Sequence, residues 1–188
     1  LAKRYGKPLK YFRFPYNDLG KDSLQHKEIE QYLSKKAYQI APFTVESEDW
    51  IFGDVYEYYL AKNDLANAKS IGEQYVKKTI EFFEFFETLA TQQYKRSIRQ
   101  IYLCHDNALN AEYLPKIIKL LKAKGYTFVS LDEALQDSIY QQQDNYHKEW
   151  GVSWLYRWMK FQTEATAIMR KEPSNKEIER LYKEITKE

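Results

Sequence analysis

The chain contains a single cysteine, three histidines and no long hydrophobic run. The one cysteine, Cys104, excludes a disulfide bond within the chain, and because strand-like residues flank it we expect a small buried apolar group rather than a nucleophile. No apolar run approaches the roughly 18 residues that a membrane-spanning helix needs, so we expect no membrane span. The first ten residues carry too much charge for a signal peptide.

The chain also lacks an excess of either charge. Lysine and arginine total 29 and aspartate and glutamate total 27, which gives a net charge of +2, and both signs are interspersed along the predicted helices. Without a basic stripe, we do not expect nucleic-acid binding. The length of 188 residues, with 44% hydrophobic and 30% charged residues, is typical of a globular protein with one main domain.

Strand-like and helical patterns alternate four times in the first 139 residues, with short loops between them. The predicted strands are 10–14, 38–45, 98–104 and 126–129. The predicted helices are about 23–36, two helices within 52–94, 111–124, and about two turns after Ser130. This alternation favours a parallel α/β sheet with right-handed crossovers.

Local signals predict several helix ends. Ser23 has the side chain of an N-cap for the first helix, and Asp64 has one for the second of the two helices within 52–94. Gly125 is a typical C-terminal stop, and Ser130 opens a capping box. The helical insertion at 52–94 exceeds a minimal crossover, and its phenylalanines recur at helical spacing, so we expect them in the core.

The composition changes at about residue 140, where a glutamine-rich stretch is followed by helical segments without strands. We therefore expect a helical carboxyl-terminal extension over residues 140–188. Trp150, Trp154 and Trp158 follow one another at four-residue spacing and give one helix face a large aromatic area. We expect them to dock the extension onto the rest of the chain; the alternative is a platform on which sugar rings stack.

Functional groups follow three successive predicted strands at the point where each strand ends. The groups are Arg13, Pro15 and Tyr16 at the first strand, Asp49 and Trp50 after the second, and Leu103 and His105 at the third. Because the carboxyl ends of the strands form the catalytic face of a parallel barrel, we expect these side chains to converge around a common cleft.

Histidine changes its charge near neutral pH, so His105 is a candidate for general acid or general base catalysis. A hydrogen bond from one ring nitrogen to a neighbouring Asp49 carboxylate would favour the imidazolium and point the other nitrogen toward substrate. The alternative is a histidine whose hydrogen bonds only stabilise the turn, without a catalytic role. His26 and His147 lie in polar helical surroundings, where we expect both to face solvent.

The first strand carries a cation and then a proline. Arg13 points away from Phe12 and Phe14 because side chains alternate along a strand. A buried guanidinium needs a carboxylate, which we expect from a neighbouring strand. Pro15 restricts the backbone, which would hold the Tyr16 amide rigidly as a donor to a developing oxyanion.

Three short motifs therefore follow in order: Arg13-Phe14-Pro15-Tyr16, Asp49-Trp50 and Leu103-Cys104-His105. Together with Gly125–Leu131, which is similar to the strand that usually follows, they resemble the third, fourth and fifth motifs of the polysaccharide deacetylase family. These metal-dependent carbohydrate esterases include chitin and peptidoglycan N-acetylglucosamine deacetylases. The resemblance covers about residues 3–138 and implies a hydrolase that removes acetyl groups from N- or O-acetylated carbohydrate by attack of metal-activated water.

The resemblance also implies a distorted, incompletely closed (β/α) barrel. A closed barrel of eight units needs about 250 residues, so we expect residues 1–139, with four units, to be the carboxyl-terminal part of one. The implied roles are Arg13 as tether of the catalytic-base aspartate, Pro15 and Tyr16 as the oxyanion-stabilising turn, Trp50 and Leu103 as walls of the acetyl pocket, His105 as general acid and Asp49 as the group that tunes it.

Two features depart from the family pattern. The family usually has glycine where this chain has Asn17, although asparagine tolerates a left-handed turn. The family's first two motifs, an Asp-Asp pair and a His-x-x-x-His helix that supply the base and bind zinc or a related divalent ion, have no counterpart. The three histidines are too widely separated to suggest a metal cluster, so we expect the ligands upstream and this chain alone to be inactive.

The expected partner is an acetylated polysaccharide or oligosaccharide, and because family members are commonly exported the resemblance implies a secreted or periplasmic protein. Two alternatives stay open. One is a hydrolase of cyclic or other non-sugar amides, and the other is a non-catalytic carbohydrate-binding protein of the same fold, with Trp50 and Trp154 as stacking surfaces. The retention of Arg13, Asp49 and His105 favours an enzyme, because a binding protein needs no proton donor with a carboxylate partner.

Overall fold

The computed structural model describes residue 6 and residues 9–186, and the chain divides into two compact units. Unit 1 contains the described residues up to Phe43 together with Gln142–Thr166, and unit 2 contains Thr44–Gln141 together with the described residues from Ala167 onward. The fold is mostly helical with a few short strands, a mixture of α and β structure, and no helix in the described ranges is long and apolar enough to cross a membrane.

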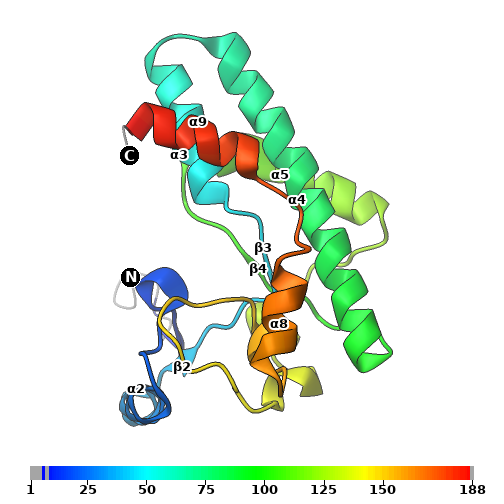
Figure 1. Ribbon diagram of the computed structural model, residues 1–188. Helices are drawn as coiled ribbons and strands as arrows, with labels where there is room; N and C mark the ends of the chain where they lie inside the picture. The colour runs from blue at the N-terminus through cyan, green and yellow to red at the C-terminus, as the bar shows by residue number, and fades with distance from the viewer. Residues whose placement is uncertain (1–5, 7–8, 187–188) are drawn as a thin grey trace. The chain divides into compact units, whose positions relative to one another are not determined.

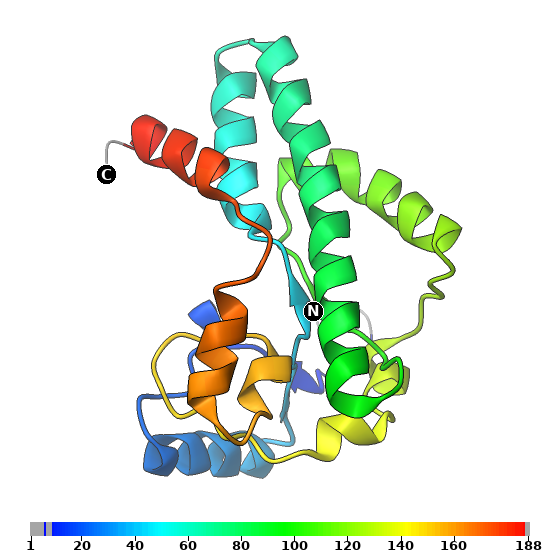
Figure 2. The same ribbon diagram turned by 45° about the vertical axis from the view of Figure 1, so that its right-hand side comes forward.

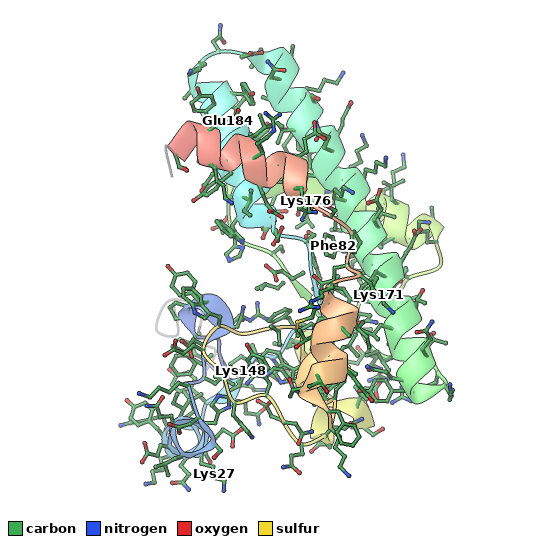
Figure 3. The ribbon with its side chains drawn as sticks, viewed as in Figure 1. Lys27, Phe82, Lys148, Lys171, Lys176 and Glu184 are labelled. Carbon is green, nitrogen blue, oxygen red and sulfur yellow. The ribbon has the colours of Figure 1, made fainter. Side chains whose placement is uncertain are left out.

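Four helices build most of unit 2, and α3 and α4 run side by side (Figure 1 and Figure 2). Their bounds are α3 Asp49–Ala61, α4 Leu65–Tyr94, α5 Ala108–Ala123 and α9 Lys176–Thr186. The break between α3 and α4 lies where it was predicted, and the Asp64 side chain caps α4 by accepting from the Asn67 amide at 3.1 Å. Helix α9, with Lys176 and Glu184 near its two ends in Figure 3, packs against α3.

The strands pair in two separate parallel sheets. In unit 2, β3 (Val45–Glu46) lies beside β4 (Tyr102–Leu103), with Val45 opposite Tyr102. In unit 1, β1 (Tyr11–Phe12) lies beside β2 (Gln39–Ile40). The predicted strand 38–45 is thus divided between the two sheets. Pro42 explains the interruption, because it lacks an amide hydrogen and restricts the residue before it.

The fourth predicted strand, 126–129, is wrong. This segment has no regular structure, and Phe128 and Val129 are exposed. It lines a groove of about 780 Å³ together with residues 97–102, which lead into β4, rather than pairing with that strand. A strand needs a hydrogen-bonded neighbour as well as β-favouring residues, and the described strands form two-stranded sheets without a closed barrel.

Most of the local end signals are confirmed. Gly125 ends α5 with φ +91°, and the Ser130 side chain accepts from the Glu133 amide to start α6, Leu131–Ala134. Helix α2, Ser23–Lys35, differs: its N-cap is Asp22, not the predicted Ser23. The Asp22 carboxylate accepts from two main-chain amides, a task for which a carboxylate has more acceptor capacity than a hydroxyl.

The carboxyl-terminal extension contributes to both units. It contains α7 (Trp154–Arg157), α8 (Gln162–Met169) and α9, and the division between the units falls within α8. Trp154 and Trp158 are buried, as the docking prediction requires, and Trp154 packs on Phe43 within unit 1. Trp150 is largely exposed, although its ring contacts Tyr16 in the same unit.

A buried arginine organises unit 1. Arg157 is fully buried between the rings of Trp154 and Tyr146, and its Nε donates to Asp144 Oδ2 at 3.0 Å. His26 is also buried, and its Nε2 lies 2.8 Å from the main-chain oxygen of Gly20. The prediction that His26 faces solvent is therefore wrong. The residues next to His26 in sequence are polar, so the sequence contained no sign that this face of α2 points inward.

The other histidine prediction is confirmed, since His147 is exposed. The remaining short elements are two 3-10 turns, η1 (Pro15–Asn17) and η2 (Ser138–Gln141). The turn η1 follows β1 directly and contains two of the predicted site residues.

Gly72 tests how closely α4 and α5 pack. A Cβ at this position would overlap the Tyr113 ring on α5. Alanine usually stabilises a helix relative to glycine by about 1 kcal/mol, but here we expect Gly72→Ala to lower the free energy of unfolding by about 1–3 kcal/mol, because the helices must separate. Urea unfolding measures the change. The control Ser70→Ala, on the exposed face of α4, should change stability by less than about 0.5 kcal/mol, and a Gly72→Ala variant as stable as wild type would contradict this packing.

Candidate active site

Asp49 and His105 meet at the carboxyl end of the β3–β4 pair. Asp49 begins α3 shortly after β3, and His105 follows β4 closely, so the parallel pairing brings both to one edge. Asp49 Oδ1 lies 2.8 Å from His105 Nδ1, and the main-chain amide of His105 donates to Asp49 Oδ2 at 2.6 Å. The structure thus contains the predicted contact between the carboxylate and the imidazole.

The two side chains differ in exposure. The Asp49 side chain is 0% exposed, whereas the His105 side chain is 51% exposed. A buried carboxylate is costly unless donors surround it. Asp49 has the amide and Nδ1 of His105 and, in addition, Nδ2 of Asn110 at 2.6 Å, and its place in the first turn of α3 adds the favourable end of the helix dipole.

This geometry determines what the imidazole can do. With Nδ1 directed at the carboxylate, the hydrogen-bonded hydrogen lies on Nδ1, and Nε2 is directed away from Asp49 on a half-exposed ring. The hydrogen bond to the carboxylate holds the plane of the ring. The pair can therefore deliver a proton from Nε2 or, in the neutral state, accept one there.

Glu46 lies close to the carboxyl end of the β3–β4 pair and was not among the residues predicted for the site. It lies on β3, opposite Leu103 of β4, and burial raises its pKa to about 7, with further raising by Glu48, Asp49 and Glu172 and an opposing effect of His105. A charged residue at a strand end, three positions before Asp49, was the available signal. Glu46 therefore titrates near neutral pH beside the Asp49–His105 pair.

Glu48 supports the same edge. It takes a left-handed conformation with φ +55° at the N-cap of α3, and its Oε2 accepts from Asn175 Nδ2 at 2.8 Å. Burial raises the pKa of the Glu48 carboxyl. A residue of the carboxyl-terminal extension therefore holds the turn that leads into Asp49.

Arg13 lies in unit 1. Its Nε donates to the main-chain oxygen of Ala41 at 3.1 Å and its Nη2 to that of Pro42 at 3.2 Å, and the guanidinium lies over the Phe43 ring. These contacts tie β1 to the segment that follows β2. A carboxylate partner for Arg13 stays a prediction.

The turn after Arg13 is strained and exposed. Tyr16 and Asn17 have φ +56° and +51°, so Asn17 takes the left-handed conformation that was expected in place of glycine. The amide of Gly151 donates to the Tyr16 oxygen at 2.8 Å, and a Cβ on Gly151 would overlap the Asn17 main chain. The Trp150 ring contacts the Tyr16 ring edge-on at 5.1 Å, with Tyr16 73% and Trp150 62% exposed. The extension thus packs closely against this turn, and its Trp150 ring forms an exposed aromatic pair with Tyr16.

The predicted pocket walls have different surroundings. Trp50 is partly exposed beside the Asp49–His105 pair, and its ring contacts Tyr182 of α9 edge-on. Leu103 is buried in the core of unit 2 and has little surface for a ligand. Cys104 is of intermediate exposure, so it is less buried than was expected.

Within the described ranges, no three His, Cys, Asp or Glu side chains are placed to hold a metal ion. The ligands of the divalent ion that the resemblance implies were expected upstream, so the ion stays a prediction. No protein-family model, curated protein or solved structure matches the chain. The function must therefore be inferred from the geometry of the Asp49–His105 pair and from the three motifs.

The raised pKa of Glu46 predicts that the stability of the fold depends on pH. Folding raises its pKa from 4.5 to about 7, so the folded state binds more protons between these values. This contribution to stability is full below about pH 4.5 and is lost as the pH rises through about 7.

The neutral variant Glu46→Gln lacks this titration. We expect its free energy of unfolding, relative to wild type, to rise by about 1–3 kcal/mol between about pH 4 and about pH 8, as measured by urea unfolding. Glu73→Gln, an exposed position on α4, is the control and should show no such trend. A difference between Glu46→Gln and wild type that does not vary with pH would contradict the raised pKa of Glu46.

Proposed function

We propose that this chain is part of a hydrolase of the polysaccharide deacetylase type, which removes acetyl groups from N- or O-acetylated carbohydrate with His105 as general acid. The observation that carries the proposal is the buried Asp49 carboxylate bonded to a half-exposed imidazole at the carboxyl end of two parallel strands. The order of the three motifs supplies the substrate class. The chemistry of the pair supplies the reaction type.

In this proposal His105 acts when the carbon–nitrogen bond of the acetamide breaks. The nitrogen leaves as an amine only if it receives a proton, which Nε2 of the imidazolium donates. The ring then becomes neutral, and its Nδ1–H still donates a hydrogen bond to Asp49 Oδ1. An ester leaves as an alkoxide, which is a far better leaving group than an amide anion, so the proton matters more for N-acetyl than for O-acetyl substrates.

The proposed architecture is the carboxyl-terminal part of a distorted (β/α) barrel. The β3–β4 pair with α3 and α4 as its crossover is one unit of that type, which supports the proposal. Trp50, in the same unit as Asp49 and His105, is the proposed substrate contact. The roles that the resemblance implies for Arg13, Pro15 and Tyr16, which belong to unit 1, stay predictions. The divalent ion would supply activated water from ligands outside this chain, and the step assigned to His105 does not pass through it.

Removal of the imidazole tests the proposed acid. In the full-length protein with divalent ions, His105→Ala should lower acetate release from N-acetylated chito-oligosaccharides by about 10²–10⁴-fold, because general acid catalysis contributes this much. Release from O-acetylated xylan should fall less. His147→Ala, which replaces an exposed histidine of unit 1, is the control. Unchanged turnover of both substrates in a folded His105→Ala protein would remove His105 from the mechanism.

A hydrolase of non-sugar amides is compatible with the same pair of side chains. The two substrate classes separate on a panel of chito-oligosaccharides, acetylated xylan and small cyclic ureides. Preference for the ureides would replace carbohydrate as the substrate while leaving the role of His105 intact.

The exposed Tyr16–Trp150 pair favours a second candidate function, a carbohydrate-binding protein without turnover. Aromatic faces stack on sugar rings, and these two side chains lie in solvent. Trp154, which the sequence suggested as a stacking surface, cannot stack on sugar because it is buried against Phe43 and Arg157. Trp50 remains accessible.

Binding without turnover distinguishes this candidate from the enzyme. A chito-oligosaccharide titration followed by tryptophan fluorescence should show about two- to tenfold weaker binding for Trp150→Ala if the pair stacks on sugar, since a stacked aromatic contributes about 0.5–1.5 kcal/mol. His105→Ala should bind normally. Phe161→Ala, which removes another exposed aromatic side chain of unit 1, is the matched control. Tight binding that is lost with Trp150, together with no acetate release by the full-length protein, would favour the binding protein.

A further inference from the structure

A buried chain of polar groups leads from α4 to the Asp49 carboxylate. The groups come from α4, the end of β3, β4 and α5. The contacts are Thr79 Oγ1–Ser47 Oγ at 3.0 Å, Ser47 Oγ–Tyr102 Oη at 2.8 Å, Tyr102 Oη–Tyr75 Oη at 2.9 Å, Tyr75 Oη–Asn110 Oδ1 at 2.6 Å and Asn110 Nδ2–Asp49 Oδ2 at 2.6 Å.

The orientation of the Asn110 amide is determined by its neighbours. One end of the amide contacts Asp49 Oδ2 and the main-chain oxygen of His105, and both of these atoms only accept hydrogen bonds. That end must therefore be the NH₂ group. The other end, Oδ1, faces Tyr75 and accepts from its hydroxyl.

The direction of every other bond follows from this one. A tyrosine hydroxyl has a single hydrogen, and that of Tyr75 is used on Asn110. Tyr102 must then donate to Tyr75, Ser47 to Tyr102, and Thr79 to Ser47. All the hydrogens point toward Asp49, so each bond polarises the next in the direction that favours a negative carboxylate.

Because these polar groups are buried, each one needs its neighbour in the chain as a hydrogen-bond partner. Ser47, Tyr75 and Thr79 are fully buried, and burial raises the pKa values of Tyr75 and Tyr102, so both tyrosines keep the hydrogen that they donate. A buried hydroxyl without a partner costs about 1–3 kcal/mol. Phenylalanine would fill the same space without this cost, as Phe82 and Phe83 do elsewhere on α4.

We propose that Asn110 and Tyr75 are positioning residues for the Asp49–His105 pair. Asn110 holds Asp49 Oδ2, which leaves Oδ1 for His105 Nδ1 and thereby selects the tautomer and the ring plane of the imidazole. Tyr75 holds the Asn110 amide in the orientation that this requires. Helix α4, expected from sequence to be a packing insertion, thus supports the candidate site. The effect on turnover rests on the proposed function, whereas the effect on the imidazole does not.

Nitrogen-15 NMR of the His105 ring measures the tautomer in this chain without any substrate. In wild type the neutral ring should carry its hydrogen on Nδ1. Asn110→Ala should shift the ring at least about twofold in population toward the Nε2 hydrogen, and Tyr75→Phe should shift it in the same direction by less. Tyr126→Phe, a ring beside Phe83 and outside the polar chain, and Asn67→Ala, an exposed position on α4, are the controls and should resemble wild type.

Tyr75→Phe keeps the ring and removes one oxygen, so it tests the proposal even if Asn110→Ala does not fold. A folded Tyr75→Phe and a folded Asn110→Ala that both keep the wild-type tautomer would overturn the positioning role. In the full-length protein the same variants should lower kcat by about tenfold with little change in KM, as is typical for residues that orient a reacting group. If the full-length protein releases no acetate while the tautomer shifts as expected, the proposed function fails and the positioning role stands.

Discussion

The buried negative charge of Asp49 is the constraint on which the rest of the candidate site depends. A carboxylate removed from water needs several donors, and in this chain His105, after β4, and Asn110, in the first turn of α5, supply them, while the N-terminal end of α3 adds its helix dipole. Both donor residues are more than fifty positions from Asp49 in sequence. The parallel pairing of β3 with β4 brings them to the same edge as Asp49, so the strand pairing and the charge stabilise one arrangement together.

The contact between Asp49 and His105 was predictable because it depends on a general property of parallel strands, namely that their carboxyl ends meet at one edge. The caps at Asp64 and Ser130 and the stop at Gly125 were predictable for a different reason, since each depends on a few adjacent residues. The polar chain behind the pair was not. Tyr75 lies on α4 at the spacing of apolar core residues, and its polar role depends on partners in β4 and α5 that only the folded chain brings near.

The strand predictions failed where pairing, rather than local propensity, decides the outcome. Residues 38–45 favour extended structure, but Pro42 interrupts the ladder and the two halves pair with different partners. Residues 126–129 have strand-forming side chains but pair with none of the described strands. The burial of His26 was hidden for a related reason. Its acceptor is the Gly20 oxygen and its ring contacts His147, which is distant in sequence, so the polarity of the adjacent residues gave no sign of an interior position.

The carboxyl-terminal extension was expected to be an appendage, yet its contacts lie at both segments that carry predicted site residues. In unit 1, Gly151 donates to the oxygen of Tyr16 and leaves no room for a side chain beside Asn17, which stabilises two successive left-handed residues. In unit 2, Asn175 donates to Glu48, the left-handed residue immediately before Asp49. Positive φ angles at residues other than glycine are uncommon and persist only where surrounding contacts hold them. The extension supplies such contacts at both turns, and the conformation of each motif therefore depends on residues more than a hundred positions further along the chain.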